Sequence, residues 1–422
     1  MHKLWKDIAS TSGARIYALL AGIISLSVTG RLLGPGGRGT IAAITTWVQL
    51  FSTFGFLSLG QVAIHRATTL RGRPWIGATL GSLLVLAAII TALGWCIAGV
   101  LFSAARTTVF KGLPGNLLLV GFLSLPFLVW EQYGSALLTA IDQVRIYNRA
   151  QILGRTVGIV LLLYLVALLH WRETGALIAI LCAQVTVAIA GIGRLVREAG
   201  EAIRPDRATI RELVTNGLKL HLNAIGGFLF TSTDILVITR YRGLVETGYY
   251  QMAVQLMGIL LIIPQAATMV LYSKTAQLGP DGVWPYQRKM LVPLTLGATG
   301  IGAFSAFAAP WILPLAIGSG FGPTVPIFQI MTLNLIGMTF SAIMASQWIG
   351  RGLFWQSALI TAAVGVLNLV ANCLLVPRYG MYGSVWATVG TYLLSVAANV
   401  AMALWVERRS SAAIHAAPQI GL

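Results

Sequence analysis

The sequence has little charge, few cysteines and no motif typical of a soluble enzyme. Only 10% of its 422 residues are charged, whereas a soluble domain keeps about a quarter of its residues charged so that its surface stays hydrated. Hydrophobic residues make up 57% of the chain, and the mean hydropathy is +0.80. Composition therefore excludes an ordinary water-soluble globule and indicates that most of the surface faces hydrocarbon.

Further absences narrow the chemistry. The sequence contains no Walker phosphate-binding loop, so we do not expect this chain to hydrolyse ATP. No cluster of His, Cys and acidic residues has metal-ligand spacing, and Cys96, Cys182 and Cys373 lie far apart. No long loop separates the apolar runs, although membrane glycosyltransferases and polymerases usually have one. We therefore expect neither an enzyme nor a metal or organic cofactor.

The formal net charge of +17 would suggest a nucleic-acid partner in a soluble protein. Here the basic residues lie in short loops between apolar runs, where they fix topology and contact anionic lipid headgroups. With both termini in the cytoplasm, most of the 29 Lys and Arg residues, including Arg145, Arg149 and Arg197, fall on the cytoplasmic side. We predict a multi-pass protein of a bacterial inner membrane with both termini cytoplasmic, membrane lipids around it and no nucleic-acid partner.

Apolar runs long enough to span a bilayer, about 20 residues each, occur along the whole chain. We predict about twelve helices, near residues 12–33, 40–64, 76–104, 114–138, 150–170, 174–196, 213–239, 247–273, 289–317, 323–347, 354–376 and 380–406. The predicted fold class is therefore an all-α polytopic membrane protein.

An internal repeat links the two halves of the chain. Glycines and an arginine of the segment 30–39 recur in 239–248 at one constant offset, and Trp171–Ala176 similarly resembles Tyr379–Ser384. The matching positions are Arg31 and Arg240, Gly34 and Gly243, and Gly39 and Gly248. The repeat predicts two six-helix lobes related by a pseudo-twofold axis along the membrane normal, with a transporter cavity between them.

This division predicts four segments: an N-terminal lobe at residues 1–200, a cytoplasmic linker at 201–212, a C-terminal lobe at 213–409 and a flexible tail at 410–422.

Four motifs in order resemble the polysaccharide-biosynthesis flippases, which share a superfamily with multidrug extruders and lipid II flippases. The motifs are Thr29–Thr40, Ala309–Gly318, Gln347–Leu353 and Leu367–Ser384. The resemblance extends over nearly the whole chain. It implies alternating access between two lobes and an undecaprenyl-diphosphate-linked oligosaccharide as substrate, carried from the cytoplasmic to the periplasmic leaflet. A multidrug antiporter of the same fold is the alternative. Coupling to H⁺ or Na⁺ and a polymerase or glycosyltransferase partner are further expectations.

Asp234 is an ionisable residue within an apolar run, and such residues cost roughly 2.5–3.5 kcal/mol at a helix centre on insertion scales. A step of about 100° per residue places it in one stripe with Asn223 and Thr231. We predict that this polar stripe faces the central cavity. The alternative is a buried pair that ties Asp234 to a neighbouring helix.

Three other side chains are candidates for the mechanism. Arg15 shares a small and polar helix face with Ala18, Gly22, Ser25 and Thr29, where its guanidinium could bind a diphosphate or could extend towards the membrane surface. Glu131 and Gln132 interrupt a later apolar run, where Glu131 could take up a coupling proton or neutralise a buried arginine. Intramembrane amides could bind sugar hydroxyls or join helices, namely Gln184, Gln255, Gln265, Asn334, Asn368 and Asn372.

Overall fold

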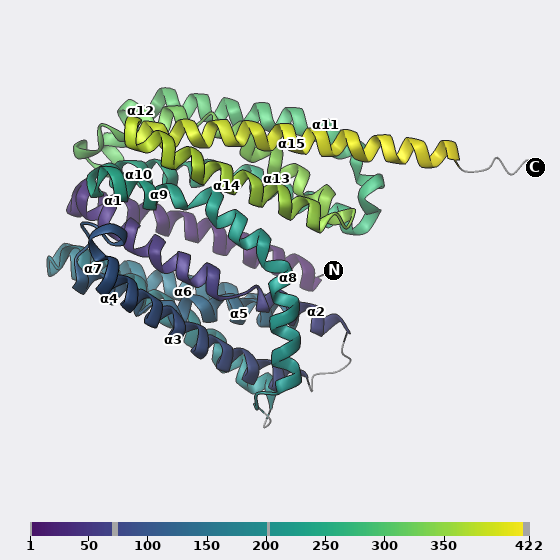
Figure 1. Ribbon diagram of the computed structural model, residues 1–422, viewed down its shortest axis with the longest axis horizontal. Helices are drawn as coiled ribbons and strands as arrows, with labels where there is room; N and C mark the ends of the chain where they lie inside the picture. Colours follow the sequence, from purple (N-terminus) through teal and green to yellow (C-terminus); the bar gives the residue numbers. More distant parts are fainter. Residues whose placement is uncertain (1, 70–74, 201–202, 417–422) are drawn as a thin grey trace, which may run out of the picture.

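The computed structural model describes residues 2–69, 75–200 and 203–416, which form helices joined by short turns and contain no strand (Figure 1). In chain order the elements are α1 (His2–Gly55), α2 (Leu59–Thr69), α3 (Trp75–Val109), α4 (Gly115–Phe122), α5 (Leu125–Ala140), α6 (Val144–Leu162), the π-helical turn η1 (Leu163–Leu168), α7 (Arg172–Ala199), α8 (Arg207–Thr231), α9 (Thr233–Arg242), α10 (Leu244–Leu260), α11 (Ile262–Ile317), the 3-10 turn η2 (Ser319–Phe321), α12 (Thr324–Met331), α13 (Asn334–Gly350), α14 (Phe354–Tyr379) and α15 (Met381–Ala416).

The number of membrane spans agrees with the sequence. Eight described helices are long and apolar enough to cross a membrane, or up to 11 spans if each of three bent helix pairs counts as one. One candidate, Tyr17–Gly55, has 39 residues; a straight helix of that length would extend about 58 Å, roughly twice the hydrocarbon thickness. It divides at Gly34 into two spans, which gives the predicted twelve. The all-α polytopic fold class is confirmed.

Two glycines reverse the chain at equivalent places in the repeat. Gly34 has φ 65° and ψ −176°, and Gly243 has φ 87° and ψ −177°, a backbone conformation that other residues rarely adopt. Beyond the first turn, the Arg38 guanidinium donates to the Thr29 hydroxyl at 3.2 Å. Residues so far apart along a straight helix would be separated by about 13 Å, so the chain has doubled back.

The two repeats contact each other directly through backbone at these turns. A Cβ atom on Gly39 would overlap the carbonyl oxygen of Leu244, and a Cβ atom on Gly248 would overlap that of Pro35. Because Pro35 and Leu244 are separated by the same offset as Gly39 and Gly248, the two contacts are symmetry mates. The repeat read from the sequence is therefore a spatial one, with its axis between Gly39 and Gly248.

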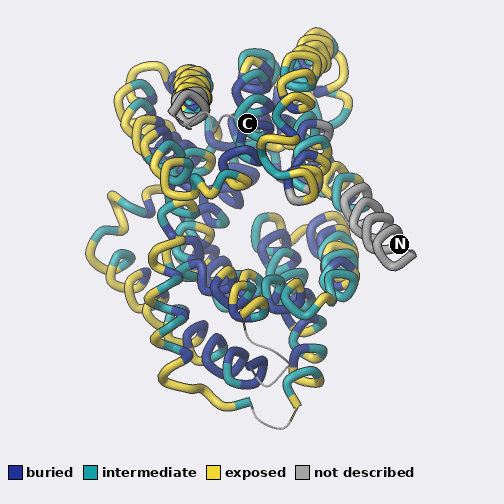
Figure 2. The backbone as a smooth tube through the Cα atoms, turned by 90° about the vertical axis from the view of Figure 1, so that its right-hand side faces the viewer, coloured by how far each residue is buried: buried dark blue, intermediate teal, exposed yellow. Residues whose placement is uncertain are grey.

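The helices form two groups, the N-lobe (α1–α7) and the C-lobe (α9–α15), with α8 running between them (Figure 1). Both ends of the described chain lie towards the right-hand side of that view. Viewed from the right-hand side, exposed residues cover the periphery of both groups (Figure 2). Many are large and apolar, for example Leu315 and Phe304, as expected for a lipid-facing surface.

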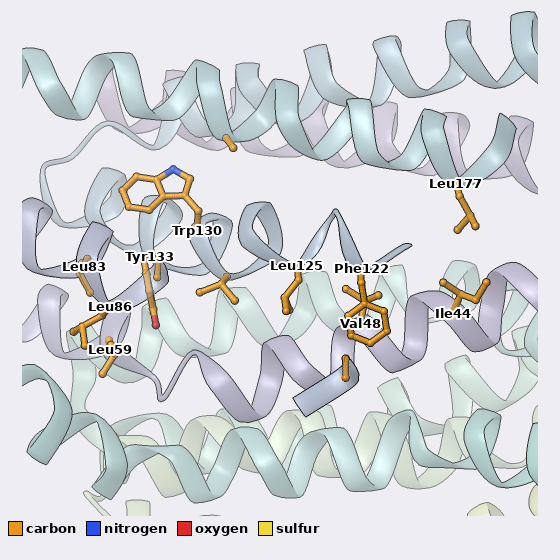
Figure 3. Close-up of a cluster of buried hydrophobic side chains, with 14 of the residues drawn as sticks. Ile44, Val48, Leu59, Leu83, Leu86, Phe122, Leu125, Trp130, Tyr133 and Leu177 are labelled. Carbon is orange, nitrogen blue, oxygen red and sulfur yellow. The ribbon is translucent and has the colours of Figure 1, made fainter. Parts of the chain in front are cut away.

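The N-lobe core holds the breaks in its helices in place. Labelled side chains from α1 to α7, among them Tyr133, Trp130 and Phe122, form one buried cluster (Figure 3). Within it the Tyr133 hydroxyl donates to the carbonyl of Phe56 at 3.0 Å, which satisfies a backbone acceptor at the break between α1 and α2. Breaks of this kind divide several helices that the sequence predicts as continuous into two shorter helices, and each such pair still corresponds to one predicted membrane span.

Residues 207–212, predicted as part of a linker, are already helical because α8 begins at Arg207. Asp206 caps this helix: its carboxylate accepts from the Thr209 hydroxyl at 2.7 Å and the Thr209 amide at 2.8 Å. These hydrogen bonds, the hydroxyl first, hold the pKa of Asp206 below its usual value. Residues 201–202 and 417–422 lie outside the described residues, and the proposed lobe and tail boundaries stay predictions.

Substitution of Gly39 by Ala should force the lobes apart at their contact, because the new Cβ would overlap backbone, which cannot rotate away. We expect the closed arrangement to lose about 1–3 kcal/mol. Spin labels on Leu32 and Val245, both exposed and on different lobes, should then show a longer distance. Gly99→Ala is the control because open space surrounds Gly99. Equal distances in the two variants would contradict the assigned contact.

Candidate functional site

A cavity of about 1760 Å³ lies between the lobes. Helices α1, α5, α6 and α7 line it from the N-lobe, and α10 and α11 line it from the C-lobe. Its wall includes Arg38, just beyond the Gly34 turn, and also Asp142 in the turn between α5 and α6 and Lys274 of α11. The Gly39–Gly248 contact lies next to Arg38 and closes the gap between the lobes at that end of the cavity.

Arg38 forms the closed end of the cavity and joins the lobes. Its guanidinium donates to Thr29 of the same lobe and to the Gln255 side-chain oxygen of α10 in the other lobe. The side chain is only 6% exposed, and its Nε atom has no partner among the described residues. A buried guanidinium with a free donor can bind an anionic group that enters the cavity.

Charges of both signs line the cavity in addition to Arg38. Arg155 of α6 and Lys274 of α11 are exposed to the cavity, as is Asp142 in the turn between α5 and α6. Glu131 of α5 is half-buried and accepts from the Gln151 amide at 2.6 Å. Three cations and two carboxylates therefore line the cavity, which leaves a small positive excess.

The remaining polar wall is rich in amides. Six glutamines line the cavity, namely Gln151, Gln184, Gln251, Gln255, Gln265 and Gln277. An amide offers both donors and acceptors, so it can replace water around hydroxyl groups of either orientation. Of the amides selected from the sequence, Gln184, Gln255 and Gln265 lie here. Asn334, Asn368 and Asn372 are buried within the C-lobe, where Asn368 donates to Thr391 at 3.0 Å.

The small and polar face predicted on the first span lines the cavity. Ala18, Gly22, Ser25 and Thr29 all contribute to its wall. The fifth member, Arg15, lies on α1, but its side chain is outside the described residues. Glu131 also lines the cavity, with amide and tyrosine partners instead of the buried arginine considered from the sequence.

The stripe that includes Asp234 does not line the cavity, contrary to the prediction. Asn223 and Thr231 are exposed on α8 outside the cavity wall, and Asp234 is buried in the C-lobe. The Asp234 carboxylate accepts from the Tyr250 hydroxyl of α10 and from the Ile235 amide. Gln132 is likewise exposed and away from the cavity.

The stripe divides because α8 and α9 are packed differently. Helix α8 packs along α14 in the C-lobe and against α2 in the N-lobe. Its His221 ring lies 3.2 Å from the Ser58 hydroxyl, and its Glu212 pairs with Arg66 of α2. A bend of 41° separates α8 from α9, which carries Asp234 and packs against α10 and α14. The α8 residues of the stripe therefore stay exposed, whereas Asp234 enters the C-lobe core.

Sequence reasoning missed Arg38, Arg155 and Lys274 as cavity residues because each lies near a predicted loop, where basic residues usually fix topology. For Arg38 a signal was available. It falls inside the repeated glycine-rich segment, which the repeat places at the interface of the lobes.

The fold is that of known two-lobed transporters. The chain superposes on lipid II flippase MurJ in an inward closed conformation with a TM-score of 0.78, at 13% identity, covering 93% of this chain and 87% of that one. A multidrug resistance MATE family transporter of the MOP superfamily superposes with a TM-score of 0.70 in an inward-facing conformation, at 17% identity and 96% coverage of each chain. An outward-facing conformation of such a transporter gives 0.58, at 16% identity, covering 94% and 96%.

The chain is thus a polytopic membrane protein with the MOP transporter fold. Its residues 4–272 match the family described as polysaccharide biosynthesis protein. The chain belongs to this family, and the resemblance found in the sequence is confirmed. A protein described as an uncharacterized membrane protein of Methanocaldococcus jannaschii is 25% identical over 211 residues, which are 46% of this chain and 40% of that protein. The match therefore spans less than half of that relative's length.

Replacement of Arg38 by Met should weaken the interlobe contact, since it removes both hydrogen bonds and leaves the Gln255 oxygen without its donor. Hydrogen bonds to a charged group contribute about 1.5–3 kcal/mol. We expect a lower unfolding temperature in detergent than for Arg149→Met, which alters an exposed arginine on α6. A stability as high as that of the Arg149 variant would show that Arg38 does not hold the lobes together.

Proposed function

We propose that this protein is a flippase that moves an undecaprenyl-diphosphate-linked oligosaccharide from the cytoplasmic to the periplasmic leaflet of a bacterial inner membrane. The observation that carries the proposal is the cavity wall, where six glutamines accompany Arg38, Arg155 and Lys274. Sugar hydroxyls need donors and acceptors in place of water, and a diphosphate needs cations. The family to which the chain belongs supports the same substrate class.

The size of the cavity supports an oligosaccharide. Sites for drug-sized molecules usually measure about 300–1,000 Å³, and this cavity of about 1760 Å³ exceeds that range. A headgroup of several sugars and a diphosphate fits such a volume. The guanidiniums of Arg38 and Arg155 provide forked donors for phosphate oxygens.

One side of the cavity suits a lipid tail. Ile23 of α1 and Ile262, Met269 and Val270 of α11 line the cavity and are also exposed large hydrophobic residues. An apolar chain next to them stays in hydrocarbon while the headgroup occupies the polar wall. This division avoids the cost of drawing the sugars through lipid or the tail through water.

Transport then requires the lobes to exchange their contacts. The Gly39–Gly248 contact and the Arg38–Gln255 hydrogen bond must separate at the closed end before the headgroup can leave there. The hydrogen bonds from Ser27 to the Ala316 carbonyl and from Arg31 to the Leu315 carbonyl also join the lobes and must break. A headgroup anion bound to Arg38 would compete with Gln255 and so favour opening.

Removal of the Arg155 charge should impair clearance of the lipid-linked intermediate. In a strain that lacks the gene, we expect lipid-linked oligosaccharide to accumulate on the inner leaflet and wild-type protein to clear it. Arg155→Ala should clear it about tenfold more slowly, equivalent to about 1.4 kcal/mol of lost binding. Arg149→Ala is the matched control, because Arg149 is exposed on the same helix outside the cavity.

Equal clearance by the two variants would leave the flippase function intact and remove Arg155 from the site. Glu131 and Asp142 also line the cavity and would suit a cationic drug. If no lipid-linked oligosaccharide accumulates but drug sensitivity changes, the multidrug antiporter is the correct reading.

Asp234 is our proposed coupling group for a H⁺ or Na⁺ gradient. It is a buried carboxylate on the C-lobe, bound by a tyrosine hydroxyl and a backbone amide. Among the ion pairs of the described residues, none includes Asp234. A buried carboxylate without a cationic partner gains much from a proton or a metal cation.

Asp234→Asn keeps the size of the side chain and removes its charge. In proteoliposomes, we expect wild-type flipping of lipid-linked oligosaccharide purified from the deletion strain to accelerate when a proton or sodium gradient is applied. The variant should keep its basal rate and lose the acceleration. Asp281→Asn, which alters an exposed carboxylate on α11, should respond as the wild type does. Acceleration of the Asp234 variant by either gradient would exclude this residue.

A further inference from the structure

A second, smaller cavity lies inside the C-lobe and adjoins the central one. It has a volume of about 320 Å³ and lies beneath the bend where α10 passes into α11. The two helix axes differ there by 49°, and Leu261 stands between them. Helices α8, α13, α14 and α15 form the other walls. Gln265 lines both cavities, so the C-lobe pocket adjoins the central cavity at that residue.

Aromatic rings form one part of the wall of the C-lobe pocket. Phe230 of α8 and Tyr392 of α15 lie with their ring centroids 4.4 Å apart. Trp348 of α13 is nearly fully buried, and its indole N–H donates to the Asn399 side-chain oxygen at 2.7 Å. This hydrogen bond fixes the orientation of the indole, so that the ring is held in place before a ligand arrives.

Hydroxyl and amide groups form another part. The hydroxyls of Ser341 and Ser395 lie 3.1 Å apart on α13 and α15. Asn399 lies one helical turn beyond Ser395 and donates to its carbonyl oxygen at 2.8 Å. None of the pocket residues is charged. The wall therefore combines aromatic faces and neutral polar groups with aliphatic side chains such as Met338 and Ile360. Such a wall suits a sugar ring, which has an apolar CH face and a hydroxyl edge.

We propose that the C-lobe pocket binds one sugar ring of the headgroup and so contributes to the choice of oligosaccharide. The volume corresponds to about ten water molecules at roughly 30 Å³ each, which leaves room for one hexose. A polyprenyl tail fits less well, because it would cover the Gln265 amide in the pocket wall without offering it a hydrogen-bond partner. The inference rests on the proposed flippase function, since it assigns a subsite to that substrate.

Fluorine NMR on protein labelled with fluorotryptophan tests the pocket by binding alone. The signal that disappears in Trp348→Phe belongs to Trp348. Addition of glucose, galactose or N-acetylglucosamine to detergent-solubilised protein should shift this signal until it saturates, with at least one sugar preferred. The signal of Trp355, which is exposed on α14 and absent from the pocket wall, should not move.

Matched phenylalanine substitutions provide the control. Ala345→Phe fills the pocket and should abolish the shift, whereas Ala363→Phe places the same ring on the exposed face of α14 and should retain it. Both variants should be compared at equal unfolding temperature, with Ser395→Ala as a milder change that should weaken binding if Ala345→Phe does not fold.

Two results would overturn the subsite. One is an unchanged Trp348 signal with all three sugars, and the other is a shift with farnesol alone, which would make the pocket a site for lipid tails. Because the readout measures binding, it separates the two proposals. Sugar binding without movement of lipid-linked oligosaccharide would contradict the flippase and leave the pocket as a sugar site.

Discussion

The two lobes meet backbone to backbone at the turns that follow Gly34 and Gly243, and this close approach constrains how they are arranged. Gly39 and Gly248 each lie against a carbonyl of the opposite repeat, and neither position has room for a side chain. Beside this contact, Ser27, Arg31 and Arg38 of the N-lobe donate hydrogen bonds to the C-lobe. The position of Arg38 between the lobes, at one end of the central cavity, follows from this constraint.

The two repeats share a backbone but have diverged in chemistry. At the repeat offset, Ser25 corresponds to Asp234, and Arg38 corresponds to Thr247. The N-lobe therefore presents a small face and a cation to the cavity, while the C-lobe keeps its carboxylate in its own core, bonded to Tyr250. This division separates the proposed binding of an anionic headgroup from the proposed coupling to a gradient. A carboxylate on the cavity wall opposite Arg38 would weaken the attraction for a diphosphate.

The polar wall is suited to release as much as to binding. Glutamine amides are neutral and mobile, so each contributes a modest net stabilisation, about 0.5–1.5 kcal/mol for a typical hydrogen bond. A cavity lined mainly by charges would hold a diphosphate more tightly and release it more slowly. The C-lobe pocket adds an ordered element to this adaptable wall, because the indole of Trp348 is fixed by Asn399.

The sequence by itself determined the membrane class, the twelve spans, the repeat and the family, because hydrocarbon length, helical periodicity and glycine-specific turns are local properties. It also placed Ser25 and Thr29 on one face, which follows from the 3.6-residue period. Only the tertiary structure decided which polar faces meet the cavity. Asp234 has the same periodicity as the N-lobe stripe, yet it lies in the core because α9 bends away from α8 and packs against α10 and α14. Arg38 and Arg155 became cavity residues only when helices distant in sequence packed around them, since a basic residue near a loop has the same local pattern in either role.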